Sequence, residues 1–137
     1  MMKPHVLMLS PTREAALRRL EDSYVLHRLD EASDPQAMLV EHGPALRAIV
    51  ANGHAPIDEA LLAHLPALEI VCCSSAGYDA FDLKALARRK VRLTNASPAL
   101  AQEVADVALL LALAGWRRLV AADVWVRDGH WAQQGDF

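Results

Sequence analysis

Short apolar runs alternate with amphipathic segments along most of this chain, which is the pattern of a parallel α/β sheet. We predict five strands, at His5–Leu9, Tyr24–Leu29, Leu46–Ala51, Leu68–Cys73 and Val91–Thr94. The segments between the strands have helical periodicity, at Thr12–Ser23, Asp34–Glu41, Ile57–Leu65 and Leu83–Lys90. The expected fold is therefore α/β and flavodoxin-like, with a parallel five-stranded sheet flanked by helices.

The pattern changes beyond the fifth strand. A polar turn leads into a long apolar helix over Pro98–Ala114, and a second helix follows at Leu119–Arg127. The tail after Arg127 is polar and aromatic, and it contains no segment that suits a strand of the same sheet. The longest uninterrupted apolar run, Val107–Ala114, is far below the roughly 20 residues that cross a bilayer. We therefore expect no membrane span and a helix that is buried on most sides.

Composition places the chain among globular proteins, with 53% hydrophobic and 23% charged residues in 137. The formal net charge is -3 and the basic clusters are short, so no nucleic-acid partner is expected. The only two cysteines are adjacent, at Cys72 and Cys73, and a bridge between neighbours on one strand would be strained. No targeting segment is visible at the N-terminus, and we expect a cytoplasmic protein with reduced cysteines.

Two motifs stand at a defined spacing after the fourth strand. The first is the turn Ser75-Ala76-Gly77-Tyr78-Asp79, with Asp82 three residues further on. The second combines Asn95-Ala96-Ser97-Pro98 with Val104-Ala105-Asp106 in the long helix. In this order they resemble the motifs of the D-isomer-specific 2-hydroxyacid dehydrogenases. Each motif alone is weak, but the two together indicate kinship over nearly the whole chain.

The resemblance implies a substrate-binding role for the small-residue turn. In the family, the residues that match Ser75, Ala76 and Gly77 bind the substrate carboxylate through main-chain amides, which suits an anion-binding concavity. Ser75 is a departure, because many relatives have glycine there. Glycine at position 77 would accept a positive φ and a close approach of the ligand. The loop Asn52-Gly53-His54 follows the third strand and is expected to line the far side of the same cleft.

The resemblance also implies what this segment lacks. None of the six glycines form a GxGxxG arrangement, so the dinucleotide fingerprint is absent. The acid–base histidine of the family, its glutamate and its arginine correspond to sequence beyond residue 137, so no catalytic residue is expected in this chain. The full enzyme would bind NAD or NADP, with Ala76 and Val104 near the cofactor, whereas this chain alone would bind none. The six histidines have no metal-ligand spacing.

The resemblance divides the chain into a substrate-binding part, residues 1–97, and an interdomain helix with a dimerisation arm, residues 98–137. A nucleotide-binding domain would follow, so we expect the front part of an enzyme that interconverts 2-oxo acids and D-2-hydroxy acids by hydride transfer. Within the family the turn looks most like that of the glyoxylate and hydroxypyruvate reductases. Whether the chain is a truncated product, a proteolytic fragment or a short gene is left open. The partners expected are the substrate and a second copy of the chain, bound through residues 98–137.

Other functions are weighed against this one. A non-catalytic module that binds small carboxylates or dimerises stays open, and the downstream reading frame would distinguish it. A phosphoacceptor receiver domain needs acidic residues after the first strand, an aspartate after the third and a lysine after the fifth. Those places hold Ser10-Pro11-Thr12, Asn52 and Asn95, which excludes it. A flavin-binding, flavodoxin-related function is not expected either, because only Ser10-Pro11-Thr12 hints at a phosphate-binding loop.

Overall fold

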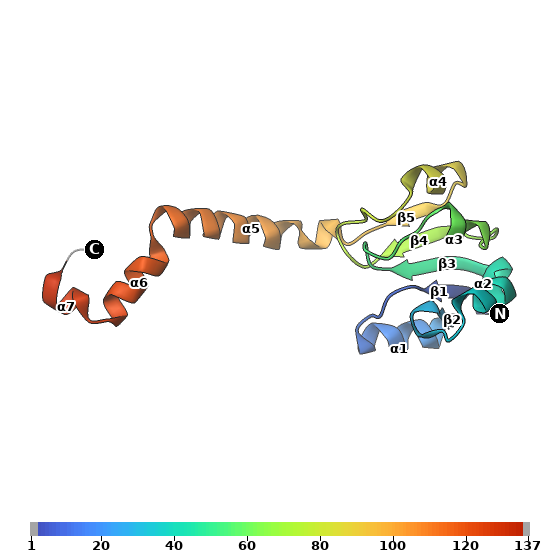
Figure 1. The fold of residues 1–137 in the computed structure, drawn as a ribbon, viewed down its shortest axis with the longest axis horizontal. Helices are drawn as coiled ribbons and strands as arrows, with labels where there is room; N and C mark the ends of the chain where they lie inside the picture. Colours follow the sequence, from blue (N-terminus) through green and yellow to red (C-terminus); the bar gives the residue numbers. More distant parts are fainter. Residues whose placement is uncertain (1–2, 136–137) are drawn as a thin grey trace. The chain divides into compact units, whose positions relative to one another are not determined.

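A computed structural model describes residues 3–135 as two compact units, one ending at Pro98 and the other starting at Ala99. The first unit contains a five-stranded parallel sheet (Figure 1). Its strands are β1 (His5–Met8), β2 (Val25–Arg28), β3 (Leu46–Ala51), β4 (Ile70–Cys73) and β5 (Arg92–Thr94). The strand order β2-β1-β3-β4-β5 is flavodoxin-like, so the predicted fold class is confirmed.

Four helices connect the strands: α1 (Glu14–Ser23), α2 (Pro35–His42), α3 (Glu59–Ala63) and α4 (Leu83–Arg88). Two short 3₁₀ turns, η1 (Leu29–Glu31) and η2 (Gly43–Ala45), flank α2. An aspartate caps three of these helices. The carboxylates of Asp34, Asp58 and Asp82 each accept the backbone N–H three residues later at 2.9 Å. Each cap satisfies a donor that the first helical turn leaves without a partner.

Two helix starts differ from the prediction. Helix α1 begins at Glu14 after Arg13, so Thr12 does not cap it. Helix α3 begins after Asp58, because Ile57 is fully buried and pairs with Phe81 in an isolated parallel bridge. The Ile57 N–H donates to Ala80 O at 3.2 Å, and the Asp82 N–H donates to Ile57 O at 2.8 Å. This bridge joins the segment after β3 to the segment after β4.

The sheet has one covered face and one partly open face. On the covered face, the buried strand residues Leu7, Ile49, Ala51, Val71 and Cys73 pack with residues of α2, α3 and α4. Leu39, Leu62 and Leu86 are the buried leucines that these three helices contribute. This face is the hydrophobic core, and it holds the strand ends in a fixed register.

The opposite face is covered only in part. Alternate residues of β3 and β4 on this side are half-buried, namely Ala48, Val50, Ile70 and Cys72. Together with Ala16 and Leu20 of α1 they line an apolar groove of about 880 Å³. Helix α1 buries none of its own residues in this chain. Cys72 and Cys73 are both free, as expected for neighbours on opposite faces.

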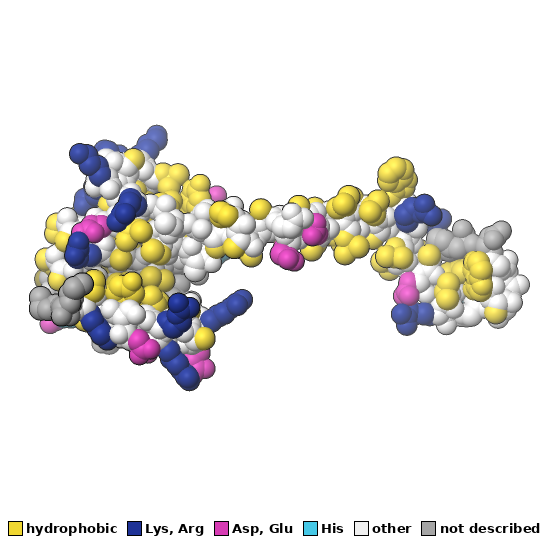
Figure 2. Space-filling view, turned by 180° about the vertical axis from the view of Figure 1, so that it is seen from behind, with side chains coloured by type: hydrophobic (Ala, Val, Ile, Leu, Met, Phe, Trp, Pro, Cys, Tyr) yellow, Lys and Arg dark blue, Asp and Glu magenta, His cyan; other side chains and the backbone are white. Residues whose placement is uncertain are grey.

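The second unit is helical, with most of α5 (Ser97–Trp116), followed by α6 (Leu119–Arg127) and α7 (His130–Gln134). The prediction that the long helix is buried on most sides was wrong, because α5 buries no residue in this chain. Hydrophobic side chains lie along α5 and α6, with an acidic patch on α5 (Figure 2). By length and composition alone α5 would be able to span a membrane, a criterion that core helices of soluble proteins also meet. Helix α7 was not predicted.

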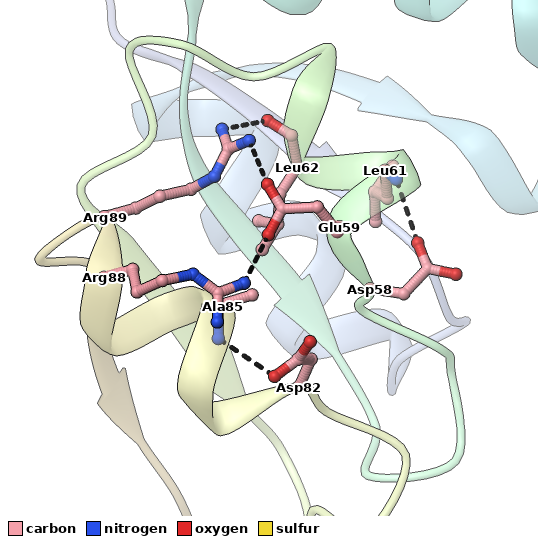
Figure 3. A network of polar contacts seen from close by, with 8 residues as sticks. All are labelled: Asp58, Glu59, Leu61, Leu62, Asp82, Ala85, Arg88 and Arg89. Atoms are coloured by element: carbon pink, nitrogen blue, oxygen red, sulfur yellow. Dashed lines mark hydrogen bonds and ion pairs between the residues drawn. The ribbon is translucent and has the colours of Figure 1, made fainter.

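A polar network joins α3 to α4 (Figure 3). The carboxylate of Glu59 accepts hydrogen bonds from Arg89 at 2.6 Å and from Arg88 at 2.8 Å. The Arg89 guanidinium also donates to Leu62 O at 2.6 Å. These bonds, Arg89 first and then Arg88, hold the pKa of Glu59 below its usual range. The network fixes α3 and α4 relative to each other, and these helices follow the loops after β3 and β4.

The rings of three histidines, from β1, β2 and α2, lie against one another. His5 Nδ1 and His27 Nε2 are hydrogen-bonded at 3.0 Å, and the His27 and His42 ring centroids are 4.4 Å apart. Burial lowers the pKa of His27, and the His42 and His5 rings lower it further, against a smaller opposing effect of Glu41. The folded chain therefore favours a neutral His27.

We expect the free energy of unfolding to fall as the pH drops from about 7 to about 5. In the unfolded chain His27 has its ordinary pKa of about 6.5, whereas in the folded chain its pKa is lower. Acid therefore favours the unfolded state, which binds the proton more readily. Urea unfolding at a series of pH values is the measurement. In His27→Gln the dependence should be flatter, and an unchanged slope would show that other groups cause it.

Candidate functional site

The candidate site lies at the carboxyl-terminal edge of the sheet, in the loops that follow β3 and β4. Asn52 organises the first loop through its own hydrogen bonds. Its Oδ1 accepts the N–H groups of His54 at 3.0 Å and Ala55 at 3.1 Å. Its backbone N–H donates to the hydroxyl of Ser10 at 3.2 Å. Asn52 therefore shapes the loop through its side-chain oxygen, and Ser10, a buried residue, supports the loop through its hydroxyl group.

The two loops are in direct contact. The Gly53 N–H donates to Ser75 Oγ at 2.7 Å, and the Ala80 N–H donates to Gly53 O at 3.3 Å. A Cβ atom at Gly53 would lie only 1.8 Å from the carbonyl oxygen of Gly77. The structure thus brings together the two groups of residues expected to bind substrate, 52–54 and 75–77. Glycine is required at position 53 because the backbones of the two loops touch there.

The three successive carbonyl groups of the turn all have partners within the chain. Ser75 O accepts the Ala96 N–H at 3.0 Å, and Ala76 O accepts Asn95 Nδ2 at 2.9 Å. Gly77 O accepts the hydroxyl of Ser75 at 2.9 Å. By contrast, within residues 3–135 the N–H groups of Ala76, Gly77 and Tyr78 have no acceptor. The turn therefore presents donors and no free acceptors, which suits a carboxylate.

The fold of the chain itself does not require glycine at position 77. Gly77 does not have a positive φ, and a Cβ there would meet only the side chain of Asp79, at 3.1 Å. The close backbone contact is at Gly53. The sequence does not predict this contact, because it depends on Gly77, 24 positions away. The one local sign is that Gly53 lies within the Asx turn that begins at Asn52.

The charges near the turn come mainly from acids. Loops 52–55 and 74–79 contain no lysine or arginine, and the exposed Asp79 flanks Gly77. A bound carboxylate would thus meet neutral backbone donors in these loops and no cationic side chain of the loops themselves. His54 is exposed at the loop surface. Val104 is exposed on α5, in the second unit, whereas Ala76 belongs to the first.

The cavities of the first unit do not coincide with this turn. The groove of about 880 Å³ extends over the open sheet face. A smaller hollow of about 300 Å³ lies beside the β3 loop and is lined by Leu9, Leu29, Asp30, Ala55 and Asp58, among others. Its two carboxylates would repel a 2-oxo acid. No cluster of metal-binding side chains occurs among the residues that the structure describes.

Comparison with known proteins identifies the family. Residues 6–132 match the catalytic domain of the D-isomer specific 2-hydroxyacid dehydrogenases. The chain belongs to this family.

Among its curated relatives, the glyoxylate/hydroxypyruvate reductase A HPR2 of Arabidopsis thaliana is 38% identical over 132 residues, which are 96% of this chain and 42% of the relative. The 2-hydroxyacid dehydrogenase of Ketogulonicigenium vulgare Y25 superimposes with a TM-score of 0.85 at 36% identity, over 100% of this chain and 43% of that structure.

A solved structure of the family was obtained with ligands. The NADPH-dependent glyoxylate/hydroxypyruvate reductase of Sinorhizobium meliloti, in complex with NADP and malonate, has a TM-score of 0.70 at 31% identity, over 98% of this chain and 41% of that structure. This 2-hydroxyacid dehydrogenase chain thus spans about two fifths of the length of the relatives it matches. The predicted kinship with NAD(P)-dependent oxidoreductases is confirmed.

Proposed function

We propose that this chain is the substrate-binding part of an NAD(P)-dependent enzyme that reduces the 2-oxo group of glyoxylate or hydroxypyruvate to give the corresponding 2-hydroxy acid, which for hydroxypyruvate is the D-isomer. The observation that carries the proposal is the turn after β4, in which three N–H groups have no partner among residues 3–135 and three carbonyl groups each accept a hydrogen bond. A carboxylate is a good acceptor for several backbone donors at once. The names of the relatives support the choice of glyoxylate and hydroxypyruvate.

In this proposal the chain binds and orients the substrate while the rest of the enzyme performs the chemistry. The turn of residues 76–78 would hold the carboxylate, and the Asn52-Gly53-His54 loop would close the other side. When bound, the nicotinamide supplies or accepts the hydride. The described residues do not fit a whole dinucleotide, because no glycine-rich phosphate loop follows any strand. Ala76 and Val104 are proposed only as residues near the cofactor, and a cytoplasmic location is proposed as it was expected from the sequence.

Residues 98–137 are proposed as a dimerisation arm. Leu109, Leu110, Leu111 and Leu113 of α5 are all exposed, and so are Trp116 and Trp131. Trp125 is instead half-buried against His130, with the ring centroids 4.7 Å apart. Each covered aromatic side chain buries on the order of 150–250 Å². A second copy of the chain, related by two-fold symmetry, would remove this apolar surface from water.

Titration of the ¹⁵N-labelled chain with oxalate tests the substrate site. We expect amide shifts at Ala76, Gly77 and Tyr78, because a hydrogen-bonded carboxylate deshields the N–H group. The uncharged analogue oxamide is the control and should cause much smaller shifts. Oxalate shifts confined to other parts of the chain would contradict the proposal.

The chain alone is expected to show no hydride transfer and no measurable affinity for NAD or NADP. An absorbance assay at 340 nm with glyoxylate and either reduced cofactor is the measurement. Turnover by the purified chain would overturn the proposed division of labour, in which the missing groups lie beyond residue 137.

A further inference from the structure

Each N–H group of the turn that lacks an acceptor within residues 3–135 shares a peptide unit with one of the anchored carbonyl groups. The described chain has no cis peptide bond, so the C=O of one residue and the N–H of the next point in opposite directions. Anchoring Ser75 O thus orients the N–H of Ala76, anchoring Ala76 O orients that of Gly77, and anchoring Gly77 O orients that of Tyr78. Whatever holds a carbonyl group therefore decides where the next donor points.

Asn95 anchors the middle peptide unit. Its Nδ2 donates to Ala76 O at 2.9 Å, and the side chain is half-buried directly after β5. The neighbouring Ala96 N–H anchors Ser75 O with a backbone hydrogen bond at 3.0 Å. The end of β5 therefore holds two peptide units of the turn, one through the backbone and one through a side chain. Only the Asn95 contribution can be removed by changing a side chain.

Ser75 anchors the third peptide unit and is not free to bind a ligand itself. Its hydroxyl accepts the Gly53 N–H at 2.7 Å and donates to Gly77 O at 2.9 Å. Since the hydroxyl group has a single hydrogen, its donor is used within the turn. The Sγ of Cys73 lies 3.3 Å from Ser75 Oγ and donates to Gly77 O at 3.4 Å, a weaker second anchor of this carbonyl group. Ser75 thus joins the two loops and supplies the stronger hydrogen bond to Gly77 O.

We propose that Ser75 and Asn95 are positioning residues of the carboxylate turn, and that the donor set comprises the N–H groups of Ala76, Gly77 and Tyr78. This inference rests on the proposed function. Asn95 sets the direction of the Gly77 N–H and Ser75 that of the Tyr78 N–H. The side chain of Ser75, a residue expected from the sequence to bind substrate, acts through the backbone of its neighbours.

The test compares oxalate titrations of the ¹⁵N-labelled chain with those of Ser75→Ala and Asn95→Ala. We expect each variant to bind oxalate about tenfold more weakly, as the loss of one hydrogen bond to a charged group implies. In Ser75→Ala the oxalate-induced shift of the Tyr78 amide should be lost while that of Gly77 persists. In Asn95→Ala the Gly77 shift should be lost while that of Tyr78 persists.

Ser74→Ala is the matched control, because the Ser74 hydroxyl donates to Ala51 O at 3.3 Å and not to the turn. It should bind oxalate like the unchanged chain. Absence of oxalate shifts at residues 75–78 in the unchanged chain would refute the proposed function itself. The positioning roles alone would be overturned if the unchanged chain binds oxalate at the turn and both variants bind it equally well. An equal loss of the oxalate-induced shifts at all three amides would overturn them too. The two variants are independent tests. If one of them does not fold, the other still tests the positioning role of its own residue.

Discussion

Replacing Gly53 by valine should lower the free energy of unfolding by about 2–3 kcal/mol, in the range of overpacked sites. A Cβ atom at this position would lie 1.8 Å from Gly77 O, which is backbone and cannot rotate away. The loops after β3 and β4 must then separate, and the hydrogen bond from Gly53 N–H to Ser75 Oγ is lost with them. Urea unfolding measures the loss of stability, and oxalate binding should disappear in the folded fraction.

Two other glycines supply controls for this variant. A Cβ atom at Gly43 would lie 2.3 Å from His64 O, so Gly43→Val should also destabilise the chain but leave oxalate binding intact in the folded fraction. A Cβ atom at Gly77 would meet only the Asp79 side chain, so Gly77→Ala should cost much less stability. Equal stability losses in Gly53→Val and Gly77→Ala would contradict the contact between the loops.

The unchanged chain should be a dimer at micromolar concentration, and Leu110→Asp with Leu113→Asp should convert it to a monomer. Both leucines are exposed on α5 in the single chain. If a second copy of the chain covers these leucines, the double variant loses the apolar area that they bury. It also places two negative charges in each apolar half of the interface. We expect the dissociation constant to rise at least about a hundredfold, the effect of removing central interface residues. Sedimentation velocity is the measurement.

Gln102→Glu is the control for added charge, because Gln102 belongs to the polar part of the same helix, where it donates to Asp106 at 2.8 Å. This variant should remain a dimer. A stable monomer of the unchanged chain would contradict the arm hypothesis, and it would mean that the apolar side chains of α5 and α6 are covered in another way.

The sequence by itself determined the order of the strands with the helices between them, and the family. These features depend on short segments, because hydrophobic periodicity marks strands and helices. The exact helix starts were less well determined: α3 was expected to begin at Ile57, whereas Asp58 caps a helix that begins at Glu59. The turn Ser75-Ala76-Gly77 also stood out as a candidate anion site, since small residues after a strand are a local signal. The proximity of the β3 and β4 loops follows from parallel strands, whose carboxyl ends share an edge.

Only the tertiary structure decided how the turn is built and which parts of the chain stay uncovered. Gly53 and Gly77 touch, Asn95 binds Ala76 O, and Ile57 pairs with Phe81, all between residues 19 or more positions apart. The direction of each N–H group depends on such distant anchors and not on the residue that carries it. Helix α5 shows the same limit, because its apolar composition predicts burial but does not say whether this chain supplies the covering surface. Local sequence patterns predict the local backbone conformation. Packing depends on contacts between residues far apart in the sequence, and no short segment contains the information about both partners.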